Sequence, residues 1–390
     1  MTSAWTISVG AADCAIRGFT NTHLQEAVDR AAAQGGGRVE VSAGEFTMAD
    51  ALHLRSGVTV SGQGAATVFR KAPMRQARIT TVIGYGHDDL IVDAPDCFRV
   101  GDGALVSSTR TGGFLDTVGT LVRREGNTWF LDRPMHHDYA EQDGATVKTL
   151  HALVDAIDIE EATIVDVTLD GNAAANEALN GCRGGAFYAY RSRRVTAQRV
   201  TARDFNGDGF SFQTCDDIEL DHCTAEDCHV IGFHPGSGSN RFHIHHGAAR
   251  RCETGLFYCL RVRDGVLEDS VFESNRGHGL LIWARDERHL NRRLVIRENG
   301  GCGICFMANP PGQESNDHTF EACILERNCA HDGPAEILLQ GGARGTRLAG
   351  NRIVRRPGFP GILIAPGMPP FADESNMIEP AGPDAVVWQA

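Results

Sequence analysis

The sequence predicts an all-β protein, a right-handed parallel β-helix, and three observations support this fold class. A glycine followed by alternating apolar residues recurs at Gly185, Gly209, Gly232, Gly255, Gly279 and Gly303. The intervals are 23 or 24 residues, which fits three short strands and three turns in each coil of a solenoid. Glycine is also abundant, with 45 among 390 residues, which suits frequent tight turns.

The chain length agrees with this prediction. A chain of 390 residues is too long for one ordinary globular core, whereas in a solenoid each coil packs only on its neighbours. Helical repeats would instead show apolar residues at i, i+3 and i+4 and far fewer glycines.

The alternation within the repeated strand predicts which side chains face inward. Phe210, Phe233 and Leu256 are expected to stack in line inside the solenoid, and Ala186 and Tyr188 are expected inside the preceding coil. Several outward positions are also large and apolar. We therefore expect that face to be a ligand-binding groove or to be covered, by a loop or by a second subunit of a homo-oligomer.

The flanking segments predict further units. A helix over 22–35, with Thr22 and Gln25 as a capping box, would close the open end of the first coil. We expect an N-terminal cap over 1–36, the first coils over 37–89, a small inserted β subdomain over 90–150, the main β-helix over 151–365 and a capping tail over 366–390.

The charge and composition of the chain limit the classes of binding partner that we expect. The formal net charge is −13, which disfavours general binding to nucleic acid or to an anionic membrane. The first residues lack the features of a signal peptide, so the 12 cysteines are expected to be free thiols in the cytoplasm, unless the sequence is the mature form of a secreted protein.

Several segments resemble a known superfamily. The opening TNTHLQEAVDRAAAQGGG, VEVSAGEF and LRSGVTVSGQG, with later LDGN, RGGAFY, GDGFSFQ and HPGSGS, is similar to pectate-lyase-type right-handed β-helix proteins of bacteria. The resemblance covers roughly residues 20–365. It implies a polysaccharide- or oligosaccharide-acting enzyme, but the superfamily includes glycosidases, lyases, epimerases, transferases and phage tailspikes, so the fold does not fix the function.

The polygalacturonase-type catalytic pattern of that superfamily is incomplete here. Asn206 to Gly209 and Gly277-His278-Gly279 are similar to two of its motifs, but its double aspartate and its R-x-K are missing. Its catalytic residues therefore cannot be transferred as a set.

One functional hypothesis is a glycoside hydrolase. Asp208 and Glu253 lie two coils apart, roughly 10 Å between backbones. The two carboxyl groups of inverting glycosidases stand roughly 6.5–9.5 Å apart, so this pair could act as acid and base, with His278 and His234 assisting.

A second hypothesis is a lyase or C-5 epimerase acting on uronates, in which Arg261 neutralises the carboxylate and His234 acts as the base. Neighbouring polar or aromatic residues are predicted to bind the sugar: Gln213, Arg263, Arg276, Trp283 and Asp286. The third hypothesis is a β-helix that binds sugar or serves a structural role without catalysis.

No cofactor is expected. Asp204 to Gly209 fits the first half of a calcium loop, but Cys215 stands where a glutamate would be needed. Cys302 and Cys305 form a single C-x-x-C without a second pair. The pairs Glu219/His243 and Asp221/His245 could hold a divalent ion on an outer face, although a solvated ladder is the favoured interpretation.

Overall fold

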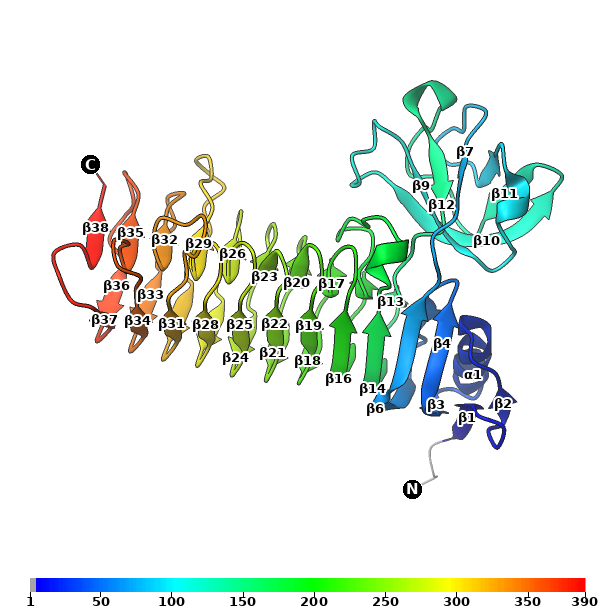
Figure 1. Ribbon diagram of the computed structural model, residues 1–390, viewed down its shortest axis with the longest axis horizontal. Helices are drawn as coiled ribbons and strands as arrows, with labels where there is room; N and C mark the ends of the chain where they lie inside the picture. The colour runs from blue at the N-terminus through cyan, green and yellow to red at the C-terminus, as the bar shows by residue number, and fades with distance from the viewer. Residues whose placement is uncertain (1–4, 390) are drawn as a thin grey trace.

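The computed structural model describes residues 5–389 as a solenoid of parallel strands (Figure 1). Within this range one side of the solenoid is an 11-stranded parallel sheet, here called the groove sheet. Its strands are β5 (Leu52–His53), β13 (Val154–Ile157), β15 (Phe187–Tyr190), β17 (Phe210–Gln213), β20 (Ile231–Gly236), β23 (Thr254–Tyr258), β26 (Leu280–Ile282), β29 (Ile304–Phe306), β32 (Ile337–Leu339), β35 (Ile362–Ile364) and β38 (Val386–Trp388).

The rest of the solenoid wall is one bent sheet of 21 described strands, which supplies the second and third strand of each coil. It begins with β1 (Thr6–Gly10), β2 (Ile16–Arg17), β3 (Gly37–Val41), β4 (Gly44–Met48), and the long strands β6 (Val58–Lys71), β14 (Thr163–Asp170) and β16 (Thr196–Arg203). The second strands are then β18 (Glu219–Asp221), β21 (His243–His245), β24 (Val266–Glu268), β27 (Leu290–Arg292), β30 (Thr319–Glu321), β33 (Arg347–Ala349) and β36 (Ala372–Glu374). The third strands are β19 (Thr224–Glu226), β22 (Ala248–Arg250), β25 (Val271–Glu273), β28 (Val295–Arg297), β31 (Ile324–Glu326), β34 (Arg352–Val354) and β37 (Met377–Glu379).

The bend between second and third strands is made by residues with positive φ. Asp166, Arg199, Asp269 and Arg293 occupy this position in their coils, with φ between 50° and 58°. Stacking of the coils brings opposite charges together there: Arg199 Nε lies 2.7 Å from Asp166 Oδ1, and Arg293 Nε lies 2.7 Å from Asp269 Oδ1. The ion pairs help to hold backbone conformations that L-residues otherwise disfavour.

The predicted inner ladder is confirmed. Phe210 pairs with Phe233, Phe233 pairs with Leu256, and all three side chains are fully buried. The rings of Phe210 and Phe233 are stacked with centroids 5.2 Å apart. The stacked side chains give the solenoid one continuous apolar core.

The preceding coil differs from the prediction by one residue. Phe187, not Ala186, pairs with Phe210, and Tyr188 pairs with Ser211 on the outward side. The glycines at 185 and 209 are 24 residues apart, but the paired strand residues are 23 apart. A shift of one residue in a strand moves every side chain to the opposite face, so Tyr188 points out of the solenoid.

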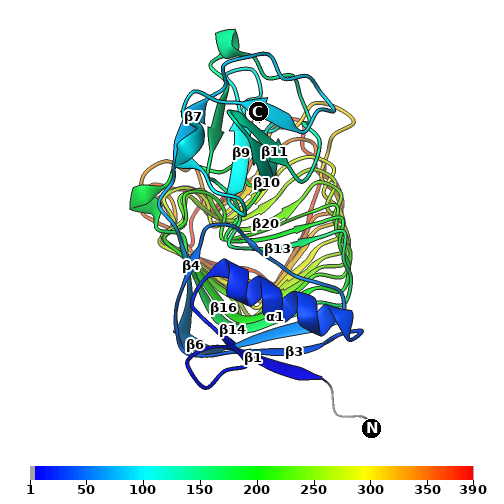
Figure 2. The ribbon, with the colours of Figure 1, turned by 90° about the vertical axis from the view of Figure 1, so that its right-hand side faces the viewer.

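A single α-helix of the described chain, α1 (Asn21–Ala33), covers the N-terminal end of the solenoid, as predicted (Figure 2). It buries Leu24, Ala27, Val28 and Ala31. The predicted capping box is wrong, because the helix begins one residue earlier, at Asn21, and Gln25 is used elsewhere. The Gln25 side chain accepts a hydrogen bond from the His53 backbone N–H and donates one to the His53 carbonyl.

The inserted β subdomain is a six-stranded antiparallel sheet that projects from one side of the solenoid (Figure 1). Its strands are β7 (Gln76–Arg78), β8 (Asp89–Ile91), β9 (Gly103–Ser107), β10 (Thr117–Glu125), β11 (Thr128–Leu131) and β12 (Thr146–Lys148). It therefore begins at Gln76 and not at residue 90, because β7 pairs with β12 and not with a coil. An alternation of apolar and polar residues predicts a strand, but it does not predict whether the neighbouring strand runs parallel or antiparallel to it.

The last described residues continue the solenoid where a capping tail was expected. β36, β37 and β38 pair in parallel with β33, β34 and β35 and complete one more coil. Residues 1–4 of the expected N-terminal cap and residue 390 of the expected tail lie outside the described residues. Across 5–389, no helix combines the length and the apolar character that crossing a bilayer requires.

Candidate active site

A cleft of 410 Å³ lies between the inserted subdomain and the outward face of the first groove-sheet strands. This volume is within the usual range for a small-molecule or oligosaccharide subsite. Residues from both units line it: Asp50, Ala51, His53, Val118, Gly119, Asp132, Arg133, Pro134, His136, His151, Ala152, Asp155, Ile157, Asp158, Arg183, Tyr188, Tyr190 and Arg191.

His53 is held between two buried carboxylates at the base of the cleft. Its Nδ1 lies 2.9 Å from Asp155 Oδ1, and its Nε2 lies 3.4 Å from Asp50 Oδ2. The charge of Asp155, assisted by Asp50 and opposed by burial, raises the pKa of His53 to about 11. His53 is therefore an imidazolium cation at neutral pH. Asp50 also accepts a hydrogen bond from Thr120 Oγ1, which ties the inserted subdomain to the coil.

Burial lowers the pKa of two further basic side chains, His151, which lines the cleft, and Lys71, which contacts the His151 backbone. Burial lowers the pKa of His151 to about 3, and its Nδ1 lies 2.6 Å from the Ala152 carbonyl oxygen. Burial also lowers the pKa of Lys71 to about 7, although the charge of Asp50 acts in the opposite direction. The Lys71 ammonium group donates a hydrogen bond to the His151 carbonyl oxygen.

Three guanidinium groups line the cleft walls. Arg133 pairs with Asp132, and Arg191 pairs with Asp158. Arg183 forms no ion pair within residues 5–389; its Nε donates to the Phe114 carbonyl oxygen at 2.7 Å. Arg183 therefore brings a positive charge that no protein carboxylate neutralises by direct contact.

His136 lies among these guanidinium groups. Burial and the positive charges of Arg183, Arg133 and Arg191 lower the pKa of His136, and a hydrogen bond to the Asp116 backbone acts in the opposite direction. The ring is consequently neutral at pH 7. A neutral imidazole that donates one N–H to a carbonyl keeps a lone pair on its other nitrogen, so His136 can accept a proton.

Two tyrosines form an aromatic wall of the cleft. The rings of Tyr188 and Tyr190 are stacked, with centroids 6.5 Å apart and planes 13° apart. Tyr188 is held by a hydrogen bond from its hydroxyl to the Cys182 carbonyl oxygen, whereas Tyr190 is only half-buried. Aromatic walls with a few polar groups are common in sites for sugar-sized ligands.

Two of the predicted catalytic residues contact each other outside this cleft. His234 Nδ1 lies 2.6 Å from Asp208 Oδ2, and the two side chains are 4% and 0% exposed. The loop 176–184 covers them: a Cβ atom added at Gly181 would clash with Asp208 Oδ2. His234 also stacks on Phe257, and its buried Nε2 has no hydrogen-bond partner in the described part of the chain. Gln213 lies beside them and donates to Ser211 Oγ.

Glu253, the proposed partner of Asp208, has different contacts. Its carboxylate pairs with Arg276 Nε at 3.0 Å, and both side chains are about half exposed. Arg276 also donates to the carbonyl oxygens of His229 and Arg251. Asp208 is buried against His234 while Glu253 is held by Arg276 at the surface, so the structure does not bring these two carboxylates into one site.

The other predicted residues, three for sugar binding and the catalytic candidate Arg261, lie on later coils and make separate contacts there. Asp286 is fully buried and accepts hydrogen bonds from the backbone N–H groups of Val262 and Trp283; burial raises its pKa to about 7. Arg263 pairs with Glu287 at 3.3 Å. Trp283 stacks on Phe257, and Arg261 is exposed beside Gly238.

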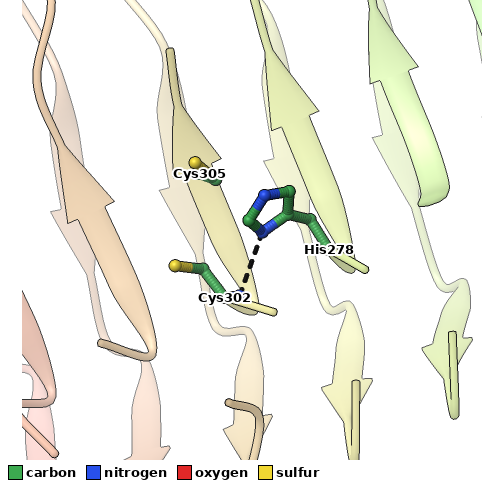
Figure 3. Close-up of side chains that lie close together, drawn as sticks. All are labelled: His278, Cys302 and Cys305. Carbon is green, nitrogen blue, oxygen red and sulfur yellow. Dashed lines mark hydrogen bonds between the residues drawn. The ribbon is translucent and has the colours of Figure 1, made fainter. Parts of the chain in front are cut away.

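His278 lies next to two cysteines of the following coil (Figure 3). Potential ligand atoms of His278, Cys302 and Cys305 lie within 4.8 Å of one another. Hydrogen bonds from the thiols of Cys305 and Cys329 lower the pKa of Cys302. The Cys302 backbone N–H donates to His278 Nδ1 at 3.0 Å, so a neutral ring carries its proton on Nε2 and offers no free nitrogen to a metal ion.

The predicted half calcium loop has other partners. Asp204 accepts a hydrogen bond from the Ala173 N–H, Asn206 donates to the Ala173 carbonyl, and Asp208 binds His234. These side chains hold the adjacent loop and do not converge on one point.

Comparison with known families shows to which family the protein belongs. The family described as "right handed beta helix region" matches residues 158–353, which is half of the chain. The protein belongs to this β-helix family. No curated protein matches it in sequence.

Solved β-helix structures share the fold at low identity. The A-modules of the mannuronan C-5 epimerases AlgE4 and AlgE6 of Azotobacter vinelandii match with TM-scores of 0.56 and 0.54, each at 16% identity. The alignments cover 95% of this chain, with 96% of the first module and 95% of the second. The Dettilon tailspike protein matches with a TM-score of 0.52 at 8% identity, over 94% of this chain and 64% of the tailspike.

The cleft residues of this β-helix protein were missed by sequence reasoning because the insertion interrupts the repeat. His53 and Asp155 are register partners although 102 positions separate them. A search for 23- or 24-residue intervals does not connect them. Even without residues 76–148 the strands at Leu52 and Val154 would be 29 residues apart, so the interval alone does not reveal this pairing.

Proposed function

We propose that the protein binds an acidic polysaccharide in this cleft and removes the C-5 proton of a uronate residue. The observation that carries the proposal is the neutral imidazole of His136 placed among the guanidinium groups of Arg133, Arg183 and Arg191. A base beside several cations is the combination that abstraction of a proton next to a carboxylate requires.

Recognition would depend on Arg183 and the tyrosine wall. Among residues 5–389 Arg183 has no carboxylate partner, and a guanidinium group binds a carboxylate through two parallel hydrogen bonds. Tyr188 and Tyr190 would contact a sugar ring. Each of the four carboxylates that line the cleft already contacts a cationic side chain, so a uronate would not have to compete for an unpaired acidic group.

In the proposed step, the unprotonated nitrogen of His136 takes the C-5 proton. The electron pair of the C–H bond moves into the carboxylate to give a dianionic enolate, which the guanidinium groups and the His53 imidazolium stabilise. Return of a proton from solvent water to the opposite face inverts C-5. Alternatively, the sugar oxygen at the neighbouring carbon is expelled and takes a proton from water, which breaks the chain and leaves a double bond. Both outcomes share the first proton transfer.

Hydrolysis by two carboxyl groups has less support from the contacts. It needs one carboxyl group that carries a proton, yet the carboxylates of the cleft are held by His53, Arg133 and Arg191. The first predicted pair, Asp208 and Glu253, does not share a site. We infer that Asp208 and His234 instead hold the loop 176–184, which carries Arg183 into the cleft.

The two A-modules named as mannuronan C-5 epimerases have the same fold, and their named reaction belongs to the proposed class. Product analysis tests the proposal. The 390-residue protein is incubated with mannuronan and with polygalacturonate, and inverted residues, unsaturated ends and new reducing ends are measured separately. Inversion or unsaturation supports the proposal; new reducing ends without unsaturation, or binding without turnover, would refute it.

His136→Gln tests the base directly. General acid–base catalysis contributes on the order of 10²–10⁴-fold, so this variant should lose at least about a hundredfold in rate. His137→Gln is the matched control, because the neighbouring His137 ring is hydrogen-bonded to the Asp138 carbonyl and does not line the cleft. Equal rates for wild type and His136→Gln would remove His136 from the mechanism.

A further inference from the structure

A second group of chemically reactive side chains lies on the outer face of β18 and β21, on the side of the solenoid away from the inserted subdomain (Figure 1). The predicted pairings are present: Glu219 is the register partner of His243, and Asp221 is the register partner of His245. His246 follows at the bend, with φ of 53°. Residues from two adjacent coils are thus brought to one place.

Three atoms of this group form a small triangle. His245 Nδ1 lies 2.9 Å from His246 Nδ1, and each of these nitrogens lies 3.2 Å from Asp221 Oδ1. In a tetrahedral zinc site with bonds of about 2.0–2.1 Å, neighbouring ligand atoms are about 3.3 Å apart. The three atoms therefore stand close to the separation that a single bound ion would impose.

Hydrogen bonds behind His245 and Asp221 fix the orientation of these two side chains. His245 Nε2 lies 3.4 Å from Glu219 Oε1, so an Nε2–H would face a carboxylate and leave Nδ1 unprotonated. The second oxygen of Asp221 accepts a hydrogen bond from Gln198 at 2.8 Å. In protein metal sites, a ligating histidine usually donates its other N–H to a carboxylate or carbonyl group. A ligating carboxylate is likewise usually hydrogen-bonded to a neighbouring residue.

The arginine–aspartate ladder at the bends is interrupted at this site. The coils before and after it pair Arg199 with Asp166 and Arg293 with Asp269. Here His222 and His246 occupy the bend positions and stack with centroids 4.5 Å apart. Asp221 forms ion pairs with histidines only, within the described residues. A cation at this point would replace the missing guanidinium group.

We propose that Asp221, His245 and His246 bind a divalent transition-metal ion of the zinc class between two coils. Two imidazole nitrogens and one carboxylate oxygen suit zinc, cobalt or nickel, whereas calcium and magnesium prefer oxygen ligands alone. The remaining coordination position is open to water or to His222, whose Nδ1 lies 2.5 Å from Asp221 Oδ1. The ion would link the coils far from the cleft and is independent of the proposed reaction.

The test is a zinc titration of the 390-residue chain without a histidine tag. Wild type, His245→Ala, Asp221→Asn and the control His331→Gln are dialysed against micromolar zinc, and bound metal and the Tm are measured. We expect wild type and control to bind one ion that raises the Tm. The two site variants should bind at least about tenfold more weakly, because mutation of even a residue that supports a metal ligand typically costs about 10–100-fold in affinity.

Asp221→Asn keeps the size of the side chain, so its circular dichroism spectrum separates a lost ligand from a lost fold. Zinc affinity equal to wild type in both folded site variants would overturn the proposal, and so would the absence of zinc binding by wild type. Cobalt substitution adds a further check. Charge-transfer bands from thiolate to cobalt would place the ion at Cys302 and Cys305 instead, and would also overturn the proposal.

Discussion

The imidazole of His53 lies 2.9 Å from the carboxylate of Asp155, although 102 residues separate them along the chain. The inserted subdomain leaves and rejoins the solenoid so that β5 and β13 pair in register. The same detour places His136 and Arg133 opposite the groove sheet. The cleft therefore depends on the insertion, which supplies one of its walls.

Replacing His53 by glutamine should destabilise the protein strongly. Asp50 and Asp155 would remain buried without their cation, and breaking a buried ion pair costs about 3–5 kcal/mol. Urea unfolding of His53→Gln measures the loss, and the double variant His53→Gln/Asp155→Asn should recover part of it. A single variant within about 0.5 kcal/mol of wild type would contradict the charged state of His53.

Arg183→Gln should reduce kcat/KM for a uronate polymer by about ten- to a hundredfold, since hydrogen bonds between charged groups contribute about 1.5–3 kcal/mol. Binding of a neutral oligosaccharide, which has no carboxylate and is not a substrate, should weaken less than binding of a uronate oligosaccharide. Arg110→Gln is the matched control, because Arg110 lies in the inserted subdomain, pairs with Asp143 and does not line the cleft. An equal loss of affinity for neutral and acidic oligosaccharides would show that Arg183 acts only through its contact with Phe114.

The buried histidine His318 should make stability depend on pH. Burial lowers its pKa to about 3, while the unfolded value is about 6.5. Between these values the unfolded chain binds more protons, so stability falls as the pH falls. From pH 6.5 to 5 this site should cost about 2 kcal/mol.

The variant His318→Leu cannot titrate at this position. It loses the Nε2–H hydrogen bond to the Asp286 carbonyl and should be less stable at neutral pH, but its stability should fall less on acidification. Urea unfolding at both pH values compares the two proteins. Equal losses would mean that His318 is not the neutral buried group described here.

Phe233→Ala should cost about 3–5 kcal/mol, because the fully buried ring leaves a cavity beside Phe210 and Leu256. Phe114→Ala is the control, since that ring is 60% exposed and should change stability by less than about 0.5 kcal/mol. Thermal unfolding compares them. Similar Tm values for both variants would contradict the continuous ladder.

The sequence predicts the ladder well and the cleft poorly, for one physical reason. Phe210, Phe233 and Leu256 repeat at a constant interval, and stacked coils convert that interval into contact. Tyr188 faces outward, contrary to the prediction, because β15 begins two residues after Gly185 whereas β17 begins one residue after Gly209. His136 and Arg183 come from a subdomain and a loop that follow no repeat, so only the folded chain brings them together.

Proton NMR of mannuronan in D₂O tests the central claim most directly, by following the C-5 proton signal during incubation with the protein. Inversion and elimination both remove this proton, so the signal should disappear with wild type and with His137→Gln, and at least about a hundredfold more slowly with His136→Gln. Cleavage of the polymer with the C-5 signal intact would contradict proton abstraction at this cleft.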